Sequence, residues 1–153
     1  MAEATQRLYI PALGGIYSAV SEFAEPILRI GLGGILIPHG CQKLFGMFGG
    51  MGLSGNAALF DRLGYTPGMF WGTLVACTEL IGGALLVLGL FTRFAAAGVL
   101  IFMIVAVKFT SAKGFFWSTQ GFEYPLLIGI CALFFLIRGG GPWSLDRTIG
   151  REI

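Results

Sequence analysis

Residues 26–48 restrict the fold of this chain more than any other segment. The segment reads P-I-L-R-I-G-L-G-G-I-L-I-P-H-G-C-Q-K-L-F-G-M-F, which is long and apolar enough for a membrane-spanning helix, yet it contains Arg29, His39 and Lys43. At about 3.6 residues per turn, His39 and Lys43 are neighbours on the helix, and Arg29 lies within about 40° of the same face. An ionisable group at the centre of a membrane helix costs about 2.5 to 3.5 kcal/mol. We therefore expect this face to point toward other helices that carry acidic residues.

The composition predicts a membrane protein. The 153 residues are 56% hydrophobic and only 12% charged, whereas about a quarter of the residues in soluble domains are charged. The apolar residues lie in long runs instead of alternating with polar ones. A net charge of +2 gives no support for nucleic acid as a partner. We predict an all-α membrane protein that forms one four-helix transmembrane bundle.

Four apolar runs give the predicted transmembrane domain of residues 26–138. The runs lie at residues 26–47, 69–91, 94–110 and 122–138. Between the first two, the glycine-rich segment 46–55 predicts a close-packed loop, and residues 56–63 predict a short interfacial helix.

The two ends of the chain predict segments outside the bundle. Residues 1–25 carry an apolar stripe at helical spacing, which predicts an amphipathic helix on the membrane surface, with Pro26 starting the first span. The stripe contains Leu13, Ile16, Tyr17 and Val20. Residues 139–153 predict a polar tail. Lys and Arg are more frequent near the two termini and the second connection than on the opposite side, so the positive-inside rule places both termini in the cytoplasm.

Small residues predict which helices pack closely. Gly33 and Gly40 are seven residues apart in the first span, and Gly82 and Gly89 are seven residues apart in the second. Membrane helices approach one another most closely at such positions, so we expect these two spans to touch along glycine.

The predicted topology brings ionisable groups toward one region in the outer half of the bundle. The candidate ligand or proton site consists of His39, Lys43, Glu79, Lys108 and Glu123. Groups near helix ends can instead reach water along their stems and act only as anchors. Glu79 lies near the middle of its span, so it is a protonated acid, a structural ion-pair partner or a functional site. We expect its carboxylate within hydrogen-bonding distance of His39 or Lys43.

No metal, haem or catalytic residue is predicted. One histidine in the whole chain cannot supply two axial ligands. Cys41, Cys77 and Cys131 lie in three different apolar segments without the close spacing of a dithiol site, so we interpret them as packing residues.

Five segments of the chain resemble the DoxX family. They are R-I-G-L-G-G-I-L-I-P-H-G-C-Q-K-L-F-G-M-F-G-G at 29–50, G-L-S-G-N-A-A-L-F at 52–60, C-T-E-L-I-G-G-A-L-L-V-L-G-L-F-T-R at 77–93, G-F-E-Y-P-L-L at 121–127 and W-S-L-D-R at 143–147. The resemblance implies a four-helix protein of the bacterial inner (plasma) membrane. It further implies a link to quinone-dependent sulfur oxidation or to oxidative-stress assemblies. The paired cysteines of more distant quinone-linked oxidoreductases have no counterpart here, so no independent catalytic activity is expected.

These observations leave three interpretations of function. The first is a membrane subunit that acts with redox partner proteins and contacts quinone through the buried His, Lys and Glu cluster. The alternative is a structural accessory subunit of a larger membrane complex, with no chemistry of its own. A proton-coupled carrier with Glu79 as its proton site ranks last, because no internal repeat or broken helix supports it.

Overall fold

The structure is a computed structural model that describes residues 8–152, and these residues form helices and turns without any strand. The helices are α1 (Gly14–Phe45), α2 (Gly52–Arg62), α3 (Gly68–Leu88), α4 (Thr92–Thr110), α5 (Glu123–Arg138) and α6 (Leu145–Ile149). Four short 3-10 turns complete the structure, η1 (Pro11–Leu13), η2 (Met47–Gly49), η3 (Ser111–Lys113) and η4 (Trp117–Thr119).

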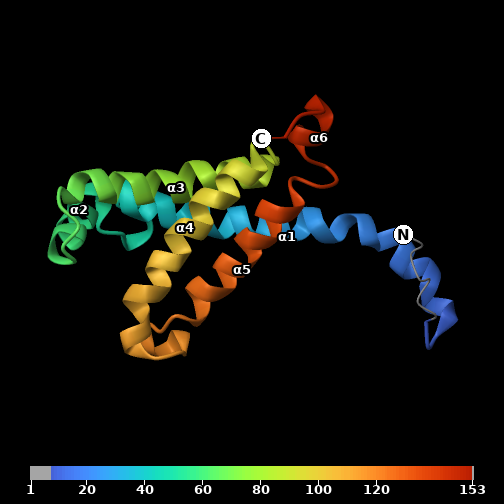
Figure 1. Cartoon of the computed structure of the whole chain (residues 1–153), viewed down its shortest axis with the longest axis horizontal. Coiled ribbons are helices and arrows are strands. Elements are labelled where there is room, and N and C mark those ends of the chain that lie inside the picture. Colours follow the sequence, from blue (N-terminus) through green and yellow to red (C-terminus); the bar gives the residue numbers. More distant parts are fainter. Residues whose placement is uncertain (1–7, 153) are drawn as a thin grey trace.

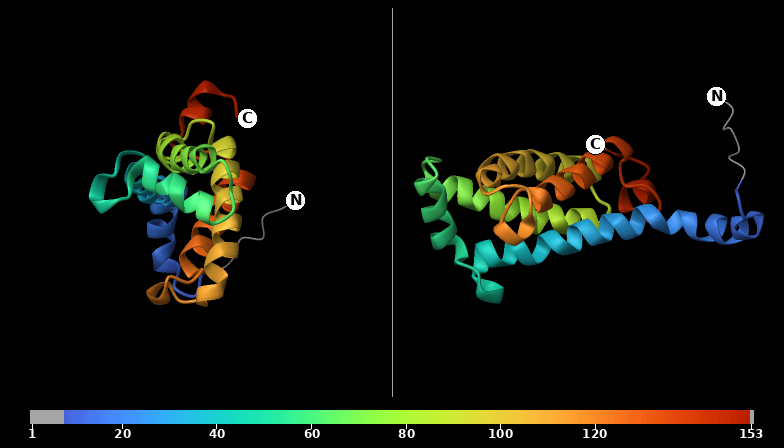
Figure 2. Two further views of the ribbon diagram at one scale, coloured as in Figure 1. Left: turned by 90° about the vertical axis from the view of Figure 1, so that its left-hand side faces the viewer. Right: turned by 90° about the horizontal axis from the view of Figure 1, so that it is seen from below.

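The long helices form two pairs. The first pair, α1 and α3, runs side by side along the long axis of the molecule, and α2 crosses one end of this pair (Figures 1 and 2). The second pair, α4 and α5, is a hairpin that is inclined to the first pair (Figure 1). The two pairs therefore meet near the α3–α4 turn and diverge toward the other end of the hairpin.

The apolar core lies where α1, α3, α4 and α5 meet. Each helix contributes at least one side chain that is almost fully excluded from solvent, including Leu36, Leu86, Val99, Ala132 and Phe135. Between membrane helices such contacts stabilise the bundle mainly through close van der Waals packing.

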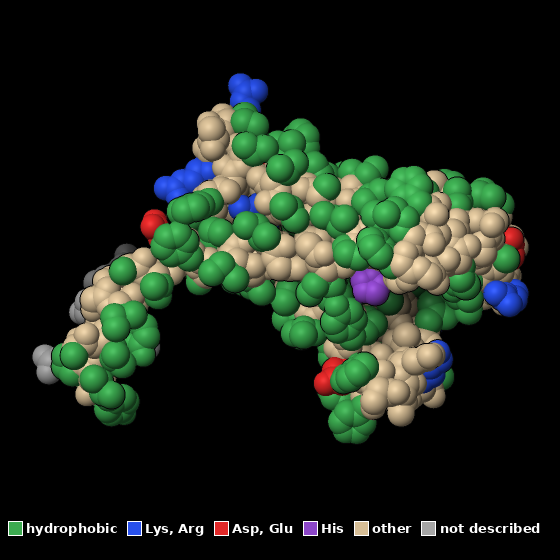
Figure 3. All heavy atoms as spheres, turned by 180° about the vertical axis from the view of Figure 1, so that it is seen from behind, with side chains coloured by type: hydrophobic (Ala, Val, Ile, Leu, Met, Phe, Trp, Pro, Cys, Tyr) green, Lys and Arg blue, Asp and Glu red, His purple; other side chains and the backbone are tan. Residues whose placement is uncertain are grey.

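The outer surface of the helices is apolar, as expected for a protein in lipid. Large aliphatic and aromatic side chains are at least half exposed on α3, α4 and α5, among them Ile81, Phe94, Ile101, Ile104, Ile130 and Ile137. Figure 3 shows hydrophobic side chains along the flanks and charged ones near the ends of the molecule. Soluble monomers rarely expose apolar surface on this scale.

Two helical segments in the described part of the chain are long and apolar enough to cross a bilayer. These are α3, with a mean hydropathy of 1.7, and the segment Thr92–Lys113, with a mean hydropathy of 2.1. Helix α5 has 16 residues and is thus about 24 Å long, shorter than the roughly 30 Å hydrocarbon layer. The four-span arrangement stays a prediction for α1 and α5.

The helix that contains the predicted first span does not begin at Pro26, contrary to the prediction, whereas the bounds of the span itself stay a prediction. Helix α1 continues from Gly14 through Pro26 and Pro38 to Phe45. Proline removes one backbone hydrogen bond, but membrane helices tolerate this loss when neighbouring groups compensate. The described part of the segment that was predicted to be a separate amphipathic helix is therefore mostly the first part of α1, and both its amphipathic character and its place on the membrane surface stay predictions.

The glycine-rich segment 46–55 is only partly a loop, which corrects a second prediction. Helix α2 begins at Gly52, four residues before the predicted start at Asn56. The Asn56 amide donates to the Gly72 carbonyl at 2.8 Å, so contact with α3 holds α2 in place. This tertiary contact outweighs the low helix propensity of glycine.

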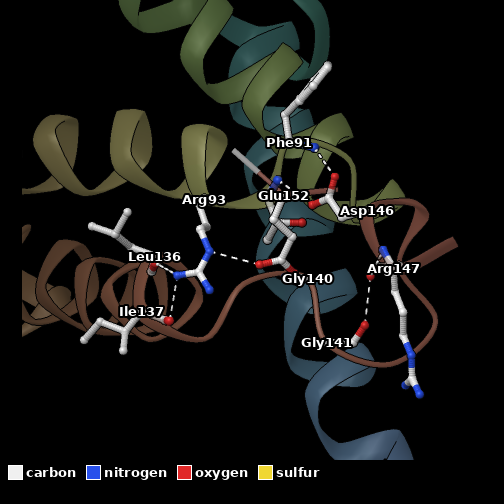
Figure 4. A network of polar contacts seen from close by, with 11 residues as sticks. Phe91, Arg93, Leu136, Ile137, Gly140, Gly141, Asp146, Arg147 and Glu152 are labelled. Carbon is white, nitrogen blue, oxygen red and sulfur yellow. Dashed lines mark hydrogen bonds and ion pairs between the residues drawn. The ribbon is translucent and has the colours of Figure 1, made fainter. Parts of the chain in front are cut away.

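The predicted polar tail is docked on the bundle. Both carboxylate oxygens of Asp146 accept backbone N–H groups, from Phe91 at 2.7 Å and from Thr92 at 2.9 Å (Figure 4). The Asp146 N–H donates to the Gly89 carbonyl at 2.9 Å. The tail therefore satisfies the backbone groups that the α3–α4 turn leaves unpaired.

Arg93 joins the tail to the end of α5. Its Nη1 donates to the carbonyls of Leu136 at 2.8 Å and Ile137 at 2.7 Å, and its Nε donates to Glu152 at 3.0 Å (Figure 4). A cation at the carboxyl end of a helix interacts favourably with the last carbonyls and the helix dipole. We call this set of contacts around Arg93, Asp146 and Glu152 the C-terminal clamp.

Arg29 belongs to this end of the bundle and not to an acidic pair. Its side chain is fully buried and donates to the carbonyls of Leu86 at 2.6 Å, Val87 at 3.1 Å and Trp143 at 3.0 Å. Arg29 makes no salt bridge within residues 8–152, so the expectation of a direct acidic partner is wrong, although the Asp146 carboxylate lies close enough to interact with its charge. Carbonyl oxygens at the end of α3 and in the C-terminal tail take the place of a carboxylate.

Candidate functional site

An ion pair between α1 and α3 forms the centre of the candidate site. The Lys43 ammonium donates to Glu79 Oε1 at 2.6 Å and to Oε2 at 2.5 Å. The Glu79 side chain is 5% exposed and that of Lys43 is 27% exposed. The predicted contact between Glu79 and the basic face of the first helix is thus confirmed for Lys43.

Glycine brings α1 and α3 close enough for this pair to form. A Cβ atom at Gly40 would lie 2.7 Å from the Cβ of Leu80, which is closer than such atoms pack. Gly33 lies in the same way against Val87, where a Cβ would be 2.8 Å from Cγ2. Lys43 follows Gly40 by about one turn and Glu79 precedes Leu80, so the close contact sets the separation of the charged groups.

The prediction for the partner glycines of α3 is wrong for Gly82. Gly83, rather than Gly82, faces Gly33 on α1, whereas the nearest atoms to Gly82 belong to α4. Gly89 ends α3 in the left-handed conformation, with φ of 64°, and lies beside Arg29 and Ser144. The seven-residue spacing therefore identified the close-packed face of α1 but not that of α3.

A cleft of about 440 Å³ lies between α2, α3 and α4, with Lys43 in its wall. Its lining is otherwise mostly aliphatic and aromatic, and the aromatic residues are Phe60, Tyr65, Trp71, Phe102 and Phe109. Lys43 Nζ lies 5.8 Å from the centroid of the Phe102 ring, within the range of a cation–π contact. The cleft thus combines an apolar lining with one cationic donor.

Tyr65 organises the aromatic wall of the cleft. Its ring packs edge-on against Phe60, Trp71 and Phe109, with centroids 6.2, 5.8 and 5.5 Å apart. Such edge-to-face pairs add to the packing energy of the rings. They connect the α2–α3 turn to the far end of α4.

This aromatic wall was not predicted from the sequence, although the sequence shows the helical spacing of several residues that form it. Phe102 and Phe109 are seven residues apart on α4, and Trp71 and Thr78 are seven residues apart on α3. Each pair therefore lies on one face of its helix. Nothing in the sequence shows that these two faces border a cleft, because that depends on the inclination of the α4–α5 hairpin.

The other predicted site residues do not join the ion pair. His39 is exposed on α1 (Figure 3), and Lys108 is exposed on α4. Glu123 accepts the backbone N–H of Trp117 at 3.0 Å and so holds the loop before α5. The predicted five-residue cluster is therefore reduced to Lys43 and Glu79, because the α4–α5 hairpin diverges from α1 at this end.

Metal-ligating side chains do not gather within residues 8–152. No group of three or more His, Cys, Asp or Glu residues there could hold a metal ion. Cys41, Cys77 and Cys131 are partly buried thiols on three different helices, α1, α3 and α5.

Comparison with known proteins gives one family and several relatives. The DoxX family model matches residues 25–117. An uncharacterized membrane protein, Rv3486, of Mycobacterium tuberculosis is 33% identical over 106 residues, which cover 61% of this chain and 64% of that protein. An uncharacterized protein of Haemophilus influenzae is 34% identical over 129 residues, or 82% of this chain and 90% of that protein.

A third relative carries a functional name. A Bacillus subtilis protein named "putative oxidoreductase CatD" is 31% identical over 107 residues, which cover 70% of this chain and 74% of that protein. No solved structure matches the chain. The family match covers more than half of the sequence and contains both Lys43 and Glu79, and the chain therefore belongs to the DoxX family of membrane proteins.

Proposed function

We propose that this protein is an inner-membrane subunit that acts with redox partner proteins and holds a quinone in the cleft beside Lys43. The observation that carries the proposal is the Lys43–Glu79 pair at the wall of an aromatic cleft. The relative named as an oxidoreductase supports a redox role. In this proposal the partner protein delivers electrons to the quinone.

The cleft suits a flat apolar ring with polar edges. Its volume of about 440 Å³ lies within the usual range for small-molecule sites, roughly 300 to 1,000 Å³. Leu63, Leu74 and Ile101 line the cleft and are also exposed on the outer surface, so the cleft is continuous with the surface that faces lipid. A quinone ring can lie between the aromatic side chains while its chain extends into the bilayer.

The Lys43–Glu79 ion pair supplies a polar contact for the quinone. An ammonium group has three N–H donors, and the two Glu79 oxygens engage at most two of them. The third donor is available to a quinone carbonyl at the edge of the ring. Glu79 gives the Lys43 ammonium a counter-ion in an otherwise apolar site. When bound, a quinone supplies two-electron redox chemistry, and Lys43 orients it and holds a proton near its oxygen.

Quinone binding can be measured with tryptophan fluorescence. Trp71 lines the cleft, so a short-chain ubiquinone titrated into the protein in lipid nanodiscs should quench its emission in a saturable manner. A hydrogen bond from a charged donor is worth about 1.5 to 3 kcal/mol, so Lys43→Met should weaken binding at least about tenfold. Lys108→Met removes a lysine of the same bundle that does not line the cleft, and it should bind like the wild type.

The fluorescence titration distinguishes a quinone-binding subunit from a structural accessory subunit. Quenching that is non-saturable, or that is the same in the Lys43→Met and Lys108→Met variants, would contradict quinone binding at the cleft. Glu79→Gln gives a second comparison. A ligand site predicts folded protein with weakened binding, whereas a purely structural pair predicts loss of folding or assembly.

A further inference from the structure

A second pocket lies at the opposite end of the bundle, between the end of α5 and the C-terminal tail. Its volume is about 480 Å³, and three arginines line it, Arg138, Arg147 and Arg151. Two carboxylates, Asp146 and Glu152, also line it. The ligand that it fits depends on which of these charges already have partners.

Both carboxylates are engaged within the C-terminal clamp. Asp146 accepts two backbone N–H groups, as described above. Glu152 Oε2 accepts from Arg93 at 3.0 Å, and its Oε1 accepts the Gly140 N–H at 3.1 Å. The two acidic groups therefore stabilise the fold through the C-terminal clamp.

The arginines retain donors that point outward. Arg138 uses only Nε, which donates to Glu25 at 2.8 Å, and its side chain is 61% exposed. Arg147 and Arg151 are exposed, and their guanidinium groups make no hydrogen bond to any other residue within 8–152. Figure 4 shows the Arg147 side chain extending away from the clamp.

Apolar side chains accompany these arginines on the same short segment. Trp143 is 66% exposed, Leu145 is 41% exposed and Ile149 is 60% exposed. Tryptophan and aliphatic groups beside arginine are typical of the membrane interface, where the apolar groups meet acyl chains and the guanidinium groups meet phosphates. Arginine binds a phosphate through two parallel hydrogen bonds.

We propose that this pocket binds the phosphodiester headgroup of an anionic phospholipid, with Arg147 and Arg151 as its main ligands and Arg138 at its edge. The exposed apolar groups of the tail favour a lipid over a free phosphate, because they would contact the acyl chains of the same molecule. This site is separate from the quinone cleft, and its test does not depend on redox activity.

Native mass spectrometry of the purified full chain in detergent can count bound lipids. We expect phosphatidylglycerol to bind more tightly than phosphatidylcholine. Each basic residue near an anionic surface contributes about 1 kcal/mol, so Arg147→Gln combined with Arg151→Gln should weaken phosphatidylglycerol binding roughly 30-fold. The charge-matched control combines Arg62→Gln with Lys113→Gln at the other end of the molecule, where both residues are exposed.

Each outcome of the lipid-binding experiment either supports or overturns the proposal. Loss of the phosphatidylglycerol preference in the tail variant, but not in the control, supports the proposal, provided that thermal unfolding shows both variants folded. Equal binding of the two lipids, or equal loss in both double variants, would overturn it. Displacement of phosphatidylglycerol by millimolar inorganic phosphate would show that the arginines bind phosphate itself and would overturn the lipid assignment.

Discussion

At the scale of single residues, Glu79 and Lys43 show how a charge in an apolar environment determines the partner of a side chain. A carboxylate near the middle of a membrane helix has few ways to remain charged, and the cheapest is a cation on an adjacent helix. That reasoning predicted the Glu79 contact from the sequence, and the structure places the Lys43 ammonium against both carboxylate oxygens.

Removing one member of this pair should destabilise the protein more than removing both. Glu79→Gln leaves the Lys43 ammonium without its partner and should cost about 2 to 3 kcal/mol, less than the roughly 3 to 5 kcal/mol of fully buried pairs because Lys43 is 27% exposed. The combination of Glu79→Gln with Lys43→Met should cost less than the sum of the two single changes. Unfolding in detergent measures all three variants. Strict additivity would show that the groups do not interact.

Other charged residues could not be placed by the same reasoning, because several acceptors can satisfy a cation. Arg29 was expected to meet an acid, but it binds three carbonyl oxygens instead. Glu123 was expected to join the cluster, but it accepts a backbone N–H of its own loop. A sequence shows the charge of each side chain, whereas free backbone groups become visible only with the fold.

At the scale of helices, the contact between α1 and α3 determines the geometry of the site. Gly40 and Gly33 let the two helices approach, and this approach places Lys43 beside Glu79. The repeat of small residues on α1 predicted the contact. The partner face of α3 was not predictable, because Gly82 and Gly83 are adjacent and only helix rotation decides which one faces α1.

A methyl group at Gly40 should separate these helices. Gly40→Ala would place its Cβ 2.7 Å from Leu80 Cβ, and overpacking of this kind costs about 1 to 3 kcal/mol. Gly34→Ala is the matched control on the same helix, because its Cβ would meet no atom within 4 Å. Thermal unfolding in detergent should show a lower midpoint for Gly40→Ala only. Equal midpoints for the two variants would contradict the close contact.

Helix boundaries were predicted well where apolar runs are uninterrupted and poorly at proline and glycine. The structure gives Gly68–Leu88 for the predicted 69–91 and Glu123–Arg138 for the predicted 122–138. Helix α1 passes through Pro26, and α2 starts within the glycine-rich segment. Local propensity favours an end or a loop at these positions. For α2, contact with α3 outweighs this propensity.

At the scale of the whole molecule, the inclination of the α4–α5 hairpin has two consequences. It separates Lys108 and Glu123 from α1, so the predicted cluster does not form. It also leaves the aromatic cleft beside α2 and α3. The angle between two helix pairs depends on the packing of many side chains at once, so neither consequence was visible in the sequence.

The predicted topology places both termini in the cytoplasm. Reporter fusions at each end should show cytoplasmic activity, and a reporter inserted near residue 64, in the α2–α3 turn, should show the opposite location. Reporters that place the two termini on opposite faces of the membrane would contradict an even number of spans.

The most direct test of the proposed quinone site is photolabelling of the protein in bacterial membranes. A photoreactive quinone should attach to peptides that carry the cleft residues of α2, α3 and α4, and excess unlabelled quinone should prevent the attachment. Labelling should fall in Lys43→Met and persist in Lys108→Met. Labelling confined to other peptides, or labelling of the cleft that unlabelled quinone does not reduce, would contradict the proposed site.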